Sequence, residues 1–156
     1  MHGEPEILEL LNEVLTAELT AVNQYFVDAK MCANWGYERL AAKFREESIG
    51  EMRDADEIIE RVLYLDGVPN MQRLGAVRVG ESVPEKLRLA LELEVAAIER
   101  LNRAVATAST ASDNGSRLLF ERILTGEESH ADWIETQLSL VSDLGENLYL
   151  AQQVHD

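Results

Sequence analysis

Hydrophobic side chains recur every three or four positions along this chain, which is the spacing of an α-helix with one buried face. A first helix is predicted over residues from about 5 to 34, where Gly36 follows its end. A second helix is predicted from about 38 to 65, and Gly67 follows it. Because only a short turn separates the two helices, we expect them to pack antiparallel.

Two more long helices are predicted in the second half of the chain. Ser82, followed three residues later by Glu85, forms a capping box that starts a helix running to about residue 110. Three successive residues offer caps for a fourth helix, namely Ser112, Asp113 and Asn114, and Gly145 ends that helix. A short tail helix is expected over about 147 to 153.

The segment between the second and third helices, residues 66 to 82, has no helical period and is too long for a hairpin turn. A helix of about 26 residues is roughly 39 Å long, and about 17 extended residues can span that distance. The second and third helices can therefore be parallel. The sequence predicts an all-α, ferritin-like four-helix bundle with one long crossover and a short C-terminal fifth helix, in a single domain over residues 1–156.

Each of the four predicted helices carries ionisable residues midway along its apolar face. Buried carboxylates without a partner are so costly that such a set requires a shared cation. Positions 18 and 94, 51 and 127, and 54 and 130 are each separated by 76 residues, which predicts a pseudo-symmetric site. Oxygen ligands with one imidazole favour iron or manganese. The predicted metal ligands are Glu18, Glu51, Asp54, Glu94, Glu127 and His130.

Two neighbours of this set keep two interpretations each. Tyr25 lies two turns beyond Glu18, where it either donates a hydrogen bond to a ligand carboxylate or is an ordinary core tyrosine. Glu47 precedes Glu51 by one turn and is either a further carboxylate near the site or a surface charge; we expect it at the surface or supporting a ligand.

The composition excludes several classes of partner. With 29 acidic and 14 basic residues, the formal net charge is −15, which disfavours nucleic acid and anionic membranes and attracts cations. The single cysteine, Cys32, cannot form an internal disulfide. The first residues lack the pattern of a signal peptide, and no apolar stretch is long enough to span a bilayer, so we expect a cytoplasmic protein.

Met52 is predicted to point out of the bundle, because it lies about 100° around the helix from Glu51. A two-fold dimer would bury the apolar residues that share this outer face, and would bring two copies of Met52 together at the axis. Paired thioethers are suitable axial ligands for haem iron, although from spacing alone a methionine at such a position is more often a packing residue. The outer face also includes Leu19, Val22, Phe26 and Ile49.

Together these residues resemble the bacterioferritin family, and the resemblance covers nearly the whole chain. It is carried by residues 3–11, 19–26 (LTAVNQYF), 46–52 (EESIGEM), 59–70 (IERVLYLDGVPN) and 127–138 (EESHADWIETQL).

The resemblance implies iron storage in a hollow shell of 24 identical subunits, built from two-fold dimers. It implies a di-iron ferroxidase centre in each subunit, at which dioxygen or peroxide oxidises Fe(II), and a small ferredoxin as electron donor for iron release. In the family, the positions of Glu18, Glu51, Glu94, Glu127 and His130 hold the ferroxidase ligands, with Glu51 and Glu127 bridging the two ions. Met52 takes the place of the methionine through which two subunits share one haem b.

Position 54 departs from the family pattern, which has histidine where this chain has Asp54. Five carboxylates leave one excess negative charge over two ferrous ions, so an altered ferroxidase activity is expected. The main alternative is a non-catalytic, haem-carrying subunit that assembles with an active second subunit type. A di-iron oxygenase is disfavoured, because so short a chain shows no obvious room for an organic substrate.

Overall fold

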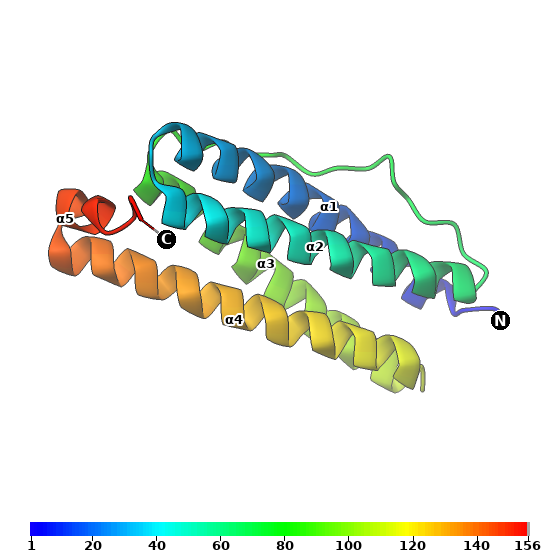
Figure 1. Cartoon of the computed structure of the whole chain (residues 1–156). Coiled ribbons are helices and arrows are strands. Elements are labelled where there is room, and N and C mark those ends of the chain that lie inside the picture. The colour runs from blue at the N-terminus through cyan, green and yellow to red at the C-terminus, as the bar shows by residue number, and fades with distance from the viewer. Residues whose placement is uncertain (156) are drawn as a thin grey trace.

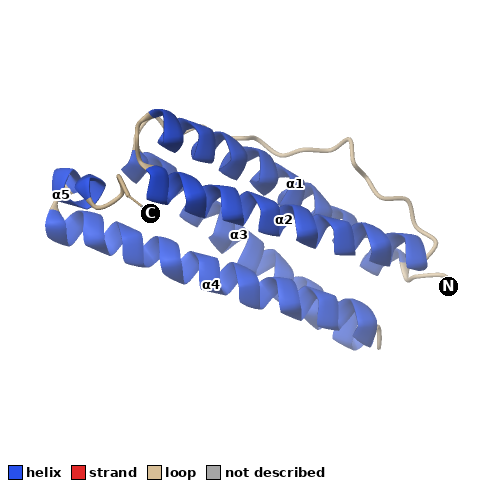
Figure 2. Ribbon diagram, viewed as in Figure 1, coloured by secondary structure: helices blue, strands red, loops and turns tan. Residues whose placement is uncertain are grey.

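The computed structural model describes residues 1–155 as four long helices and one short helix, without a strand in that range (Figures 1 and 2). The predicted all-α architecture is confirmed, and each helix begins and ends within two residues of its predicted bounds. Within residues 1–155, no helix is both long and apolar enough to cross a membrane. The helices are α1 (Pro5–Asn34), α2 (Glu38–Tyr64), α3 (Val83–Thr110), α4 (Asn114–Leu144) and α5 (Glu146–Ala151).

The bundle consists of two closely packed helix pairs, α1 with α2 and α3 with α4. The crossover between α2 and α3 runs back along the outside of α1, as Figure 1 shows, so that α2 and α3 are parallel. This confirms the prediction that the long segment connects two parallel helices. The start of α3 is also fixed, because the Ser82 side chain accepts a hydrogen bond from the Glu85 amide at 3.3 Å.

Polar side chains on α1 hold the backbone of the crossover. They are spaced by four or eight residues, so that they line one side of the helix next to its apolar face. Sequence reasoning missed this row, although its spacing is visible in the chain. The three bonds join Asn70 N to Asn12 Oδ1 (2.7 Å), Gly75 N to Thr20 Oγ1 (2.8 Å) and Arg78 N to Gln24 Oε1 (3.1 Å).

A buried ion pair continues this row at the start of α3. The Nζ atom of Lys86 lies 2.9 Å from Asp28 Oδ1 and 3.2 Å from Met31 Sδ, and it also lies over the ring of Trp35. Burial raises the pKa of the Asp28 carboxyl to about 6, although Lys86 acts in the opposite direction. The pair fixes the position at which the chain re-enters the bundle.

The apolar core is divided into two clusters, one toward each end of the bundle. Ile58 and Phe120 belong to the first cluster, and Phe44 and Ile134 to the second. The buried face of α3 combines Leu87 and Leu101 with four alanines, while Leu91, Ile98 and Val105 are half-buried beside it. Leu91 and Val105 pack against the core clusters from this edge. The buried alanines are Ala90, Ala97, Ala104 and Ala108.

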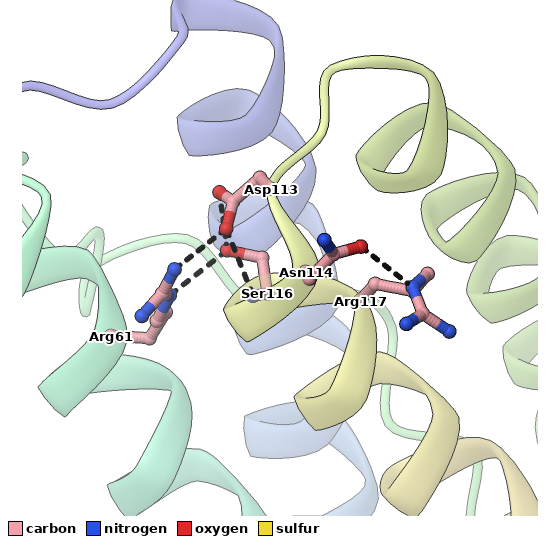
Figure 3. A network of polar contacts seen from close by, with 5 residues as sticks. All are labelled: Arg61, Asp113, Asn114, Ser116 and Arg117. Atoms are coloured by element: carbon pink, nitrogen blue, oxygen red, sulfur yellow. Dashed lines mark hydrogen bonds and ion pairs between the residues drawn. The ribbon is translucent and has the colours of Figure 1, made fainter.

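Figure 3 shows the polar network that closes the far end of the bundle. The Asp113 side chain caps α4 by accepting a hydrogen bond from the Ser116 amide at 3.0 Å. It also accepts from Arg61 of α2 at 2.6 Å, and these bonds hold the pKa of Asp113 below its usual value despite partial burial. Beside it, Arg117 donates to Asn114 at 3.2 Å. A single carboxylate thus caps one helix and joins it to another.

Replacing Asp113 with alanine should destabilise the bundle, because it removes the cap of α4 and leaves Arg61 without its partner. We expect a loss of about 1–2 kcal/mol, which is roughly 2–8 °C in the thermal midpoint followed by circular dichroism. Glu135→Ala, at an exposed position within α4, is the matched control and should leave the midpoint nearly unchanged. Equal midpoints for the two variants would contradict this role of Asp113.

Candidate metal centre

A layer of ionisable side chains lies between the two apolar clusters, at mid-height of the bundle. Every long helix contributes to it, because each carries a charged residue on its buried face at that level. Each of the four glutamates is at most 4% exposed. The sequence-predicted set is therefore brought together from four helices. The buried members are Glu18, Glu51, Glu94, Glu127 and His130.

Two groups in this layer have the geometry of metal ligands. In the first group, one oxygen from each of four carboxylates lies within 4.8 Å of the others. The second group, with the same spacing, contains an imidazole nitrogen. Glu51 belongs to both groups and so lies between them. The first group is Glu18, Glu51, Asp54 and Glu127, and the second is Glu47, Glu51 and His130.

His130 makes its contacts through Nδ1. That atom lies 2.9 Å from Glu94 Oε1 and 3.3 Å from Glu47 Oε2. The Tyr25 hydroxyl donates a hydrogen bond to the same Glu94 oxygen, which agrees with the first of its two predicted roles. The Trp133 ring stacks on the imidazole, with centroids 6.1 Å apart. These contacts fix the orientation of both the imidazole and the Glu94 carboxylate.

Glu47 was expected at the surface or supporting a ligand, and the structure places it beside Glu51 and His130, among the candidate metal ligands. It is 19% exposed, and one of its oxygens belongs to a ligand group with Glu51 and His130. The Nζ atom of Lys43, one turn earlier on α2, forms an ion pair with Glu47 Oε1 at 3.0 Å. The available signal was its position one turn before Glu51, which puts both on the same face of α2.

Asp54 lies at the edge of the layer rather than in its interior. Its side chain is 18% exposed, and its Oδ1 lies 3.3 Å from an Nη atom of Arg122 on α4. Arg122 also forms an ion pair with Glu57. The 76-residue offset predicts that Asp54 is equivalent to His130, but the two residues have different partners and different exposure.

The electrostatics of the layer reflect carboxylates buried close to one another. Burial is the main cause that raises the pKa of Glu18, Glu51 and Glu127 well above the usual value. Burial also acts on Glu94, but hydrogen bonds from Glu127 and His130 outweigh it and lower its pKa. Burial raises the pKa of Asp54 as well, against the opposing effect of Arg122.

Several buried polar atoms in the layer have no hydrogen-bond partner in the described part of the chain. Among them are one carboxylate oxygen of Glu18, one of Glu94, and Nε2 of His130. Buried polar atoms are normally paired, and an unpaired one requires an explanation such as a bound ion or water. Convergent carboxylates with free oxygens fit a cation as their missing partner.

A cavity of about 570 Å³ leads from the surface to this layer. It lies beneath the crossover, between α1 and α3, and reaches the four glutamates of the centre. So short a chain was expected to have no obvious room for an organic substrate, and the structure does contain a cavity at this position. The lining is rich in charge, unlike the mostly apolar lining of organic-ligand sites. Its outer charged residues are Glu9, Glu13, Arg73 and Arg100.

The outer face of α1 and α2 carries exposed apolar side chains, as the sequence predicted. Met52 is 57% exposed, with Phe26 and Ile49 also exposed beside it in the predicted patch. Leu19 and Val22 are half-buried at its margin. Met52 therefore points away from the metal layer, and its proposed axial ligation stays a prediction.

A four-helix bundle with one long crossover and carboxylates from all four helices at one level has the features of a ferritin-like domain. The family model described as "Ferritin-like domain" matches residues 8–144. A bacterioferritin of Mycobacterium tuberculosis is 48% identical over 154 residues, which are 99% of this chain and 97% of that protein. The bacterioferritin of Streptomyces coelicolor is 50% identical over 151 residues, covering 97% and 90%. The chain therefore belongs to the bacterioferritin family.

The raised pKa values predict how the stability of the metal-free protein varies with pH. A carboxyl with a raised pKa keeps its proton in the folded state after the unfolded chain has lost it. The free energy of unfolding therefore falls as the pH rises from about 4.5 toward the folded-state pKa values. We expect a lower thermal midpoint at about pH 7.5 than at about pH 5.5, and Zn²⁺ should restore it most at the higher pH.

The control separates this effect from the general charge of the protein. Glu127→Gln should flatten the decline, because it removes one of the buried titrating groups. Glu135→Gln removes an exposed carboxylate of the same helix and should keep the slope of the parent. Identical slopes in all three proteins would mean that the buried layer does not cause the pH dependence.

Proposed function

We propose that this protein stores iron, and that it oxidises Fe(II) at the carboxylate and histidine layer before ferric iron is deposited. The observation that supports this most strongly is the set of unpartnered, buried ligand atoms on Glu18, Glu94 and His130. Related proteins of similar length carry the name bacterioferritin, which supports iron as the metal.

The donor set agrees with iron as the substrate. Carboxylate oxygens with one imidazole suit iron better than the sulfur-rich or nitrogen-rich sets that other metals prefer. Glu51 belongs to both ligand groups, which supports its expected role between two ions. Tyr25 and His130 both contact Glu94, so that the carboxylate is oriented before a cation arrives. These contacts lower the reorganisation that metal binding requires.

The cavity beneath the crossover provides access for small reactants. Its walls carry the acidic residues Glu9 and Glu13, and the net charge of −15 raises the local concentration of cations. The Nε atom of Arg100 lies 3.6 Å from Glu13 Oε1, so the mouth of the cavity is only partly acidic. Fe(II) entering there reaches the buried glutamates, where dioxygen or peroxide accepts its electrons.

Stopped-flow oxidation of Fe(II) on the purified homopolymer tests the proposal. We expect a rapid phase that saturates at about two ions per subunit, which Glu127→Ala should slow by at least about tenfold. Glu135→Ala is the control and should oxidise iron like the parent. If the parent is no faster than Fe(II) in buffer while its shell is intact, the alternative of a non-catalytic subunit is correct.

We further propose that the outer face of α1 and α2 forms a two-fold interface within a shell of 24 subunits, and that two copies of Met52 hold haem b there. Exposed Phe26, Ile49 and Met52 support this, because an apolar face of this kind is stabilised by burial against its own copy. The thioether sulfur is a suitable axial donor. Haem, when bound, supplies a one-electron centre for reducing stored iron, with a small ferredoxin as the proposed donor.

Met52→Leu should abolish haem binding without dispersing the shell, because leucine keeps the apolar volume but has no sulfur. Haem content is measured from the absorption spectrum per subunit, and assembly by sedimentation velocity. Leu63→Met is the control, because it adds a thioether at another exposed position of α2 and keeps Met52. It should have the haem content of the parent. A Met52→Leu shell with undiminished haem would exclude this residue as the ligand.

A further inference from the structure

The metal layer has two sides, and its carboxylates are held differently on each. The cavity beneath the crossover reaches four buried glutamates from the side of α1 and α3. Glu47 and Asp54 lie on the other side, where α2 faces α4, and they are 19% and 18% exposed. Each of them belongs to a candidate ligand group together with Glu51. They therefore form a pair of edge carboxylates on the outer margin of the layer.

Glu47 is held between a lysine and the metal layer. Its Oε1 lies 3.0 Å from Lys43 Nζ, and its Oε2 lies 3.3 Å from Nδ1 of His130. The Lys43 ammonium also lies over the ring of Trp133, 5.1 Å from the centroid. Lys43 thus fixes one oxygen of the carboxylate and leaves the other directed toward the candidate ligands.

Asp54 has a corresponding partner in Arg122 of α4. One Nη atom of Arg122 lies 3.3 Å from Asp54 Oδ1, and the other contacts Glu57 of α2. One oxygen of Asp54 also lies within 4.8 Å of an oxygen of Glu18 and an oxygen of Glu51. A short aspartate side chain at a partly exposed position can rotate toward water, and the guanidinium opposes that rotation. Arg122 therefore keeps this carboxylate at the layer.

Both cations also connect α2 to α4. Lys43 of α2 contacts the Trp133 ring of α4, and Arg122 of α4 contacts two carboxylates of α2. These helices otherwise touch little, because α2 packs mainly on α1, and α4 mainly on α3. The two contacts therefore fix the relative position of the helices that border the outer margin of the layer.

The charge of the occupied layer balances only when both cations are counted. Two divalent ions neutralise four ionised carboxylates, so the two edge carboxylates leave two negative charges. Lys43 and Arg122 supply one positive charge each, directly beside the edge carboxylates. Glu57, the second partner of Arg122, is about half exposed, so water screens its charge. The six carboxylates of the layer are Glu18, Glu47, Glu51, Asp54, Glu94 and Glu127.

We propose that Lys43 and Arg122 are positioning residues of the metal centre, each of which holds one edge carboxylate in place to bind metal and neutralises its charge. Lys43 acts through Glu47, and Arg122 acts through Asp54. This inference rests on the proposed metal centre and extends its ligand set to six carboxylates. The two cations also repel a divalent ion, but the orientation of the ligands outweighs this repulsion, because partners of metal ligands generally strengthen metal binding.

Binding of Co²⁺ to the assembled, metal-free homopolymer tests this without oxidation chemistry. By equilibrium dialysis we expect the parent to bind about two ions per subunit. Lys43→Gln and Arg122→Gln should each weaken binding by about tenfold, the lower end of the loss found when a partner of a metal ligand is removed. Lys43→Arg and Arg122→Lys keep the charge and should recover most of this loss. If either glutamine variant binds Co²⁺ as tightly as the parent, or more tightly, the inference is wrong.

Two matched controls remove one positive charge from the same helices. Arg39 is exposed one turn before Lys43 on α2, and Arg117 of α4 pairs with Glu121. Arg39→Gln and Arg117→Gln change the net charge of the subunit as the test variants do, and should bind Co²⁺ like the parent. If the controls weaken binding as much as Lys43→Gln and Arg122→Gln, the effect comes from net charge and the proposed positioning is excluded.

Double variants provide a readout that a merely structural role would not change. Once Glu47→Gln has removed its partner, adding Lys43→Gln should weaken Co²⁺ binding by less than about twofold further, and the same holds for Arg122→Gln added to Asp54→Asn. A full tenfold loss in these backgrounds would show that the cations do not act through the edge carboxylates, and would overturn the inference. A parent shell that binds no Co²⁺ would instead overturn the proposed metal centre itself.

Discussion

Burying several carboxylates at one level is the constraint on which the rest of this structure depends. Four glutamates, each at most 4% exposed, lie where two apolar clusters would otherwise meet. Without a cation, burial raises the pKa of Glu18, Glu51 and Glu127 and so favours their protonated forms, whereas hydrogen bonds lower the pKa of Glu94. The apolar clusters above and below must hold the helices together against this cost. The two apolar clusters therefore support a layer that is by itself unfavourable in the metal-free protein.

Most of the fold, and the set of ionisable residues that meet in the buried layer, could be predicted from the sequence, because both follow from spacing along single helices. A carboxylate within an apolar stripe, such as Glu94, is visible without any knowledge of its neighbours. Contacts between helices were harder to predict, since they depend on how each helix is rotated. The pairing of Arg122 with Asp54 and the contact of Glu47 with His130 arise in this way. The alanine face of α3 was missed because larger side chains lie beside it.

The internal repeat of the chain relates the positions of its helices more closely than it relates the side-chain contacts in the buried layer. The 76-residue offset places Asp54 and His130 at equivalent points of two helix pairs. Asp54 pairs with Arg122 of the facing helix, whereas His130 contacts Glu94 and is more deeply buried. Pseudo-symmetry of the backbone therefore does not require equivalent side-chain contacts at the two positions.

The crossover between α2 and α3 is attached to the bundle mainly through its backbone. It is attached through its own backbone amides, at Asn70, Gly75 and Arg78, while the side chains of residues 71–79 are exposed. Exchanging most of those side chains should cost little, although the Arg78 side chain also pairs with Glu92 of α3 at 2.6 Å. Adding or removing one residue between two attachment points would misalign the backbone with the fixed row on α1. The length of this segment is therefore more tightly constrained than its composition, because the attachment points on α1 are fixed.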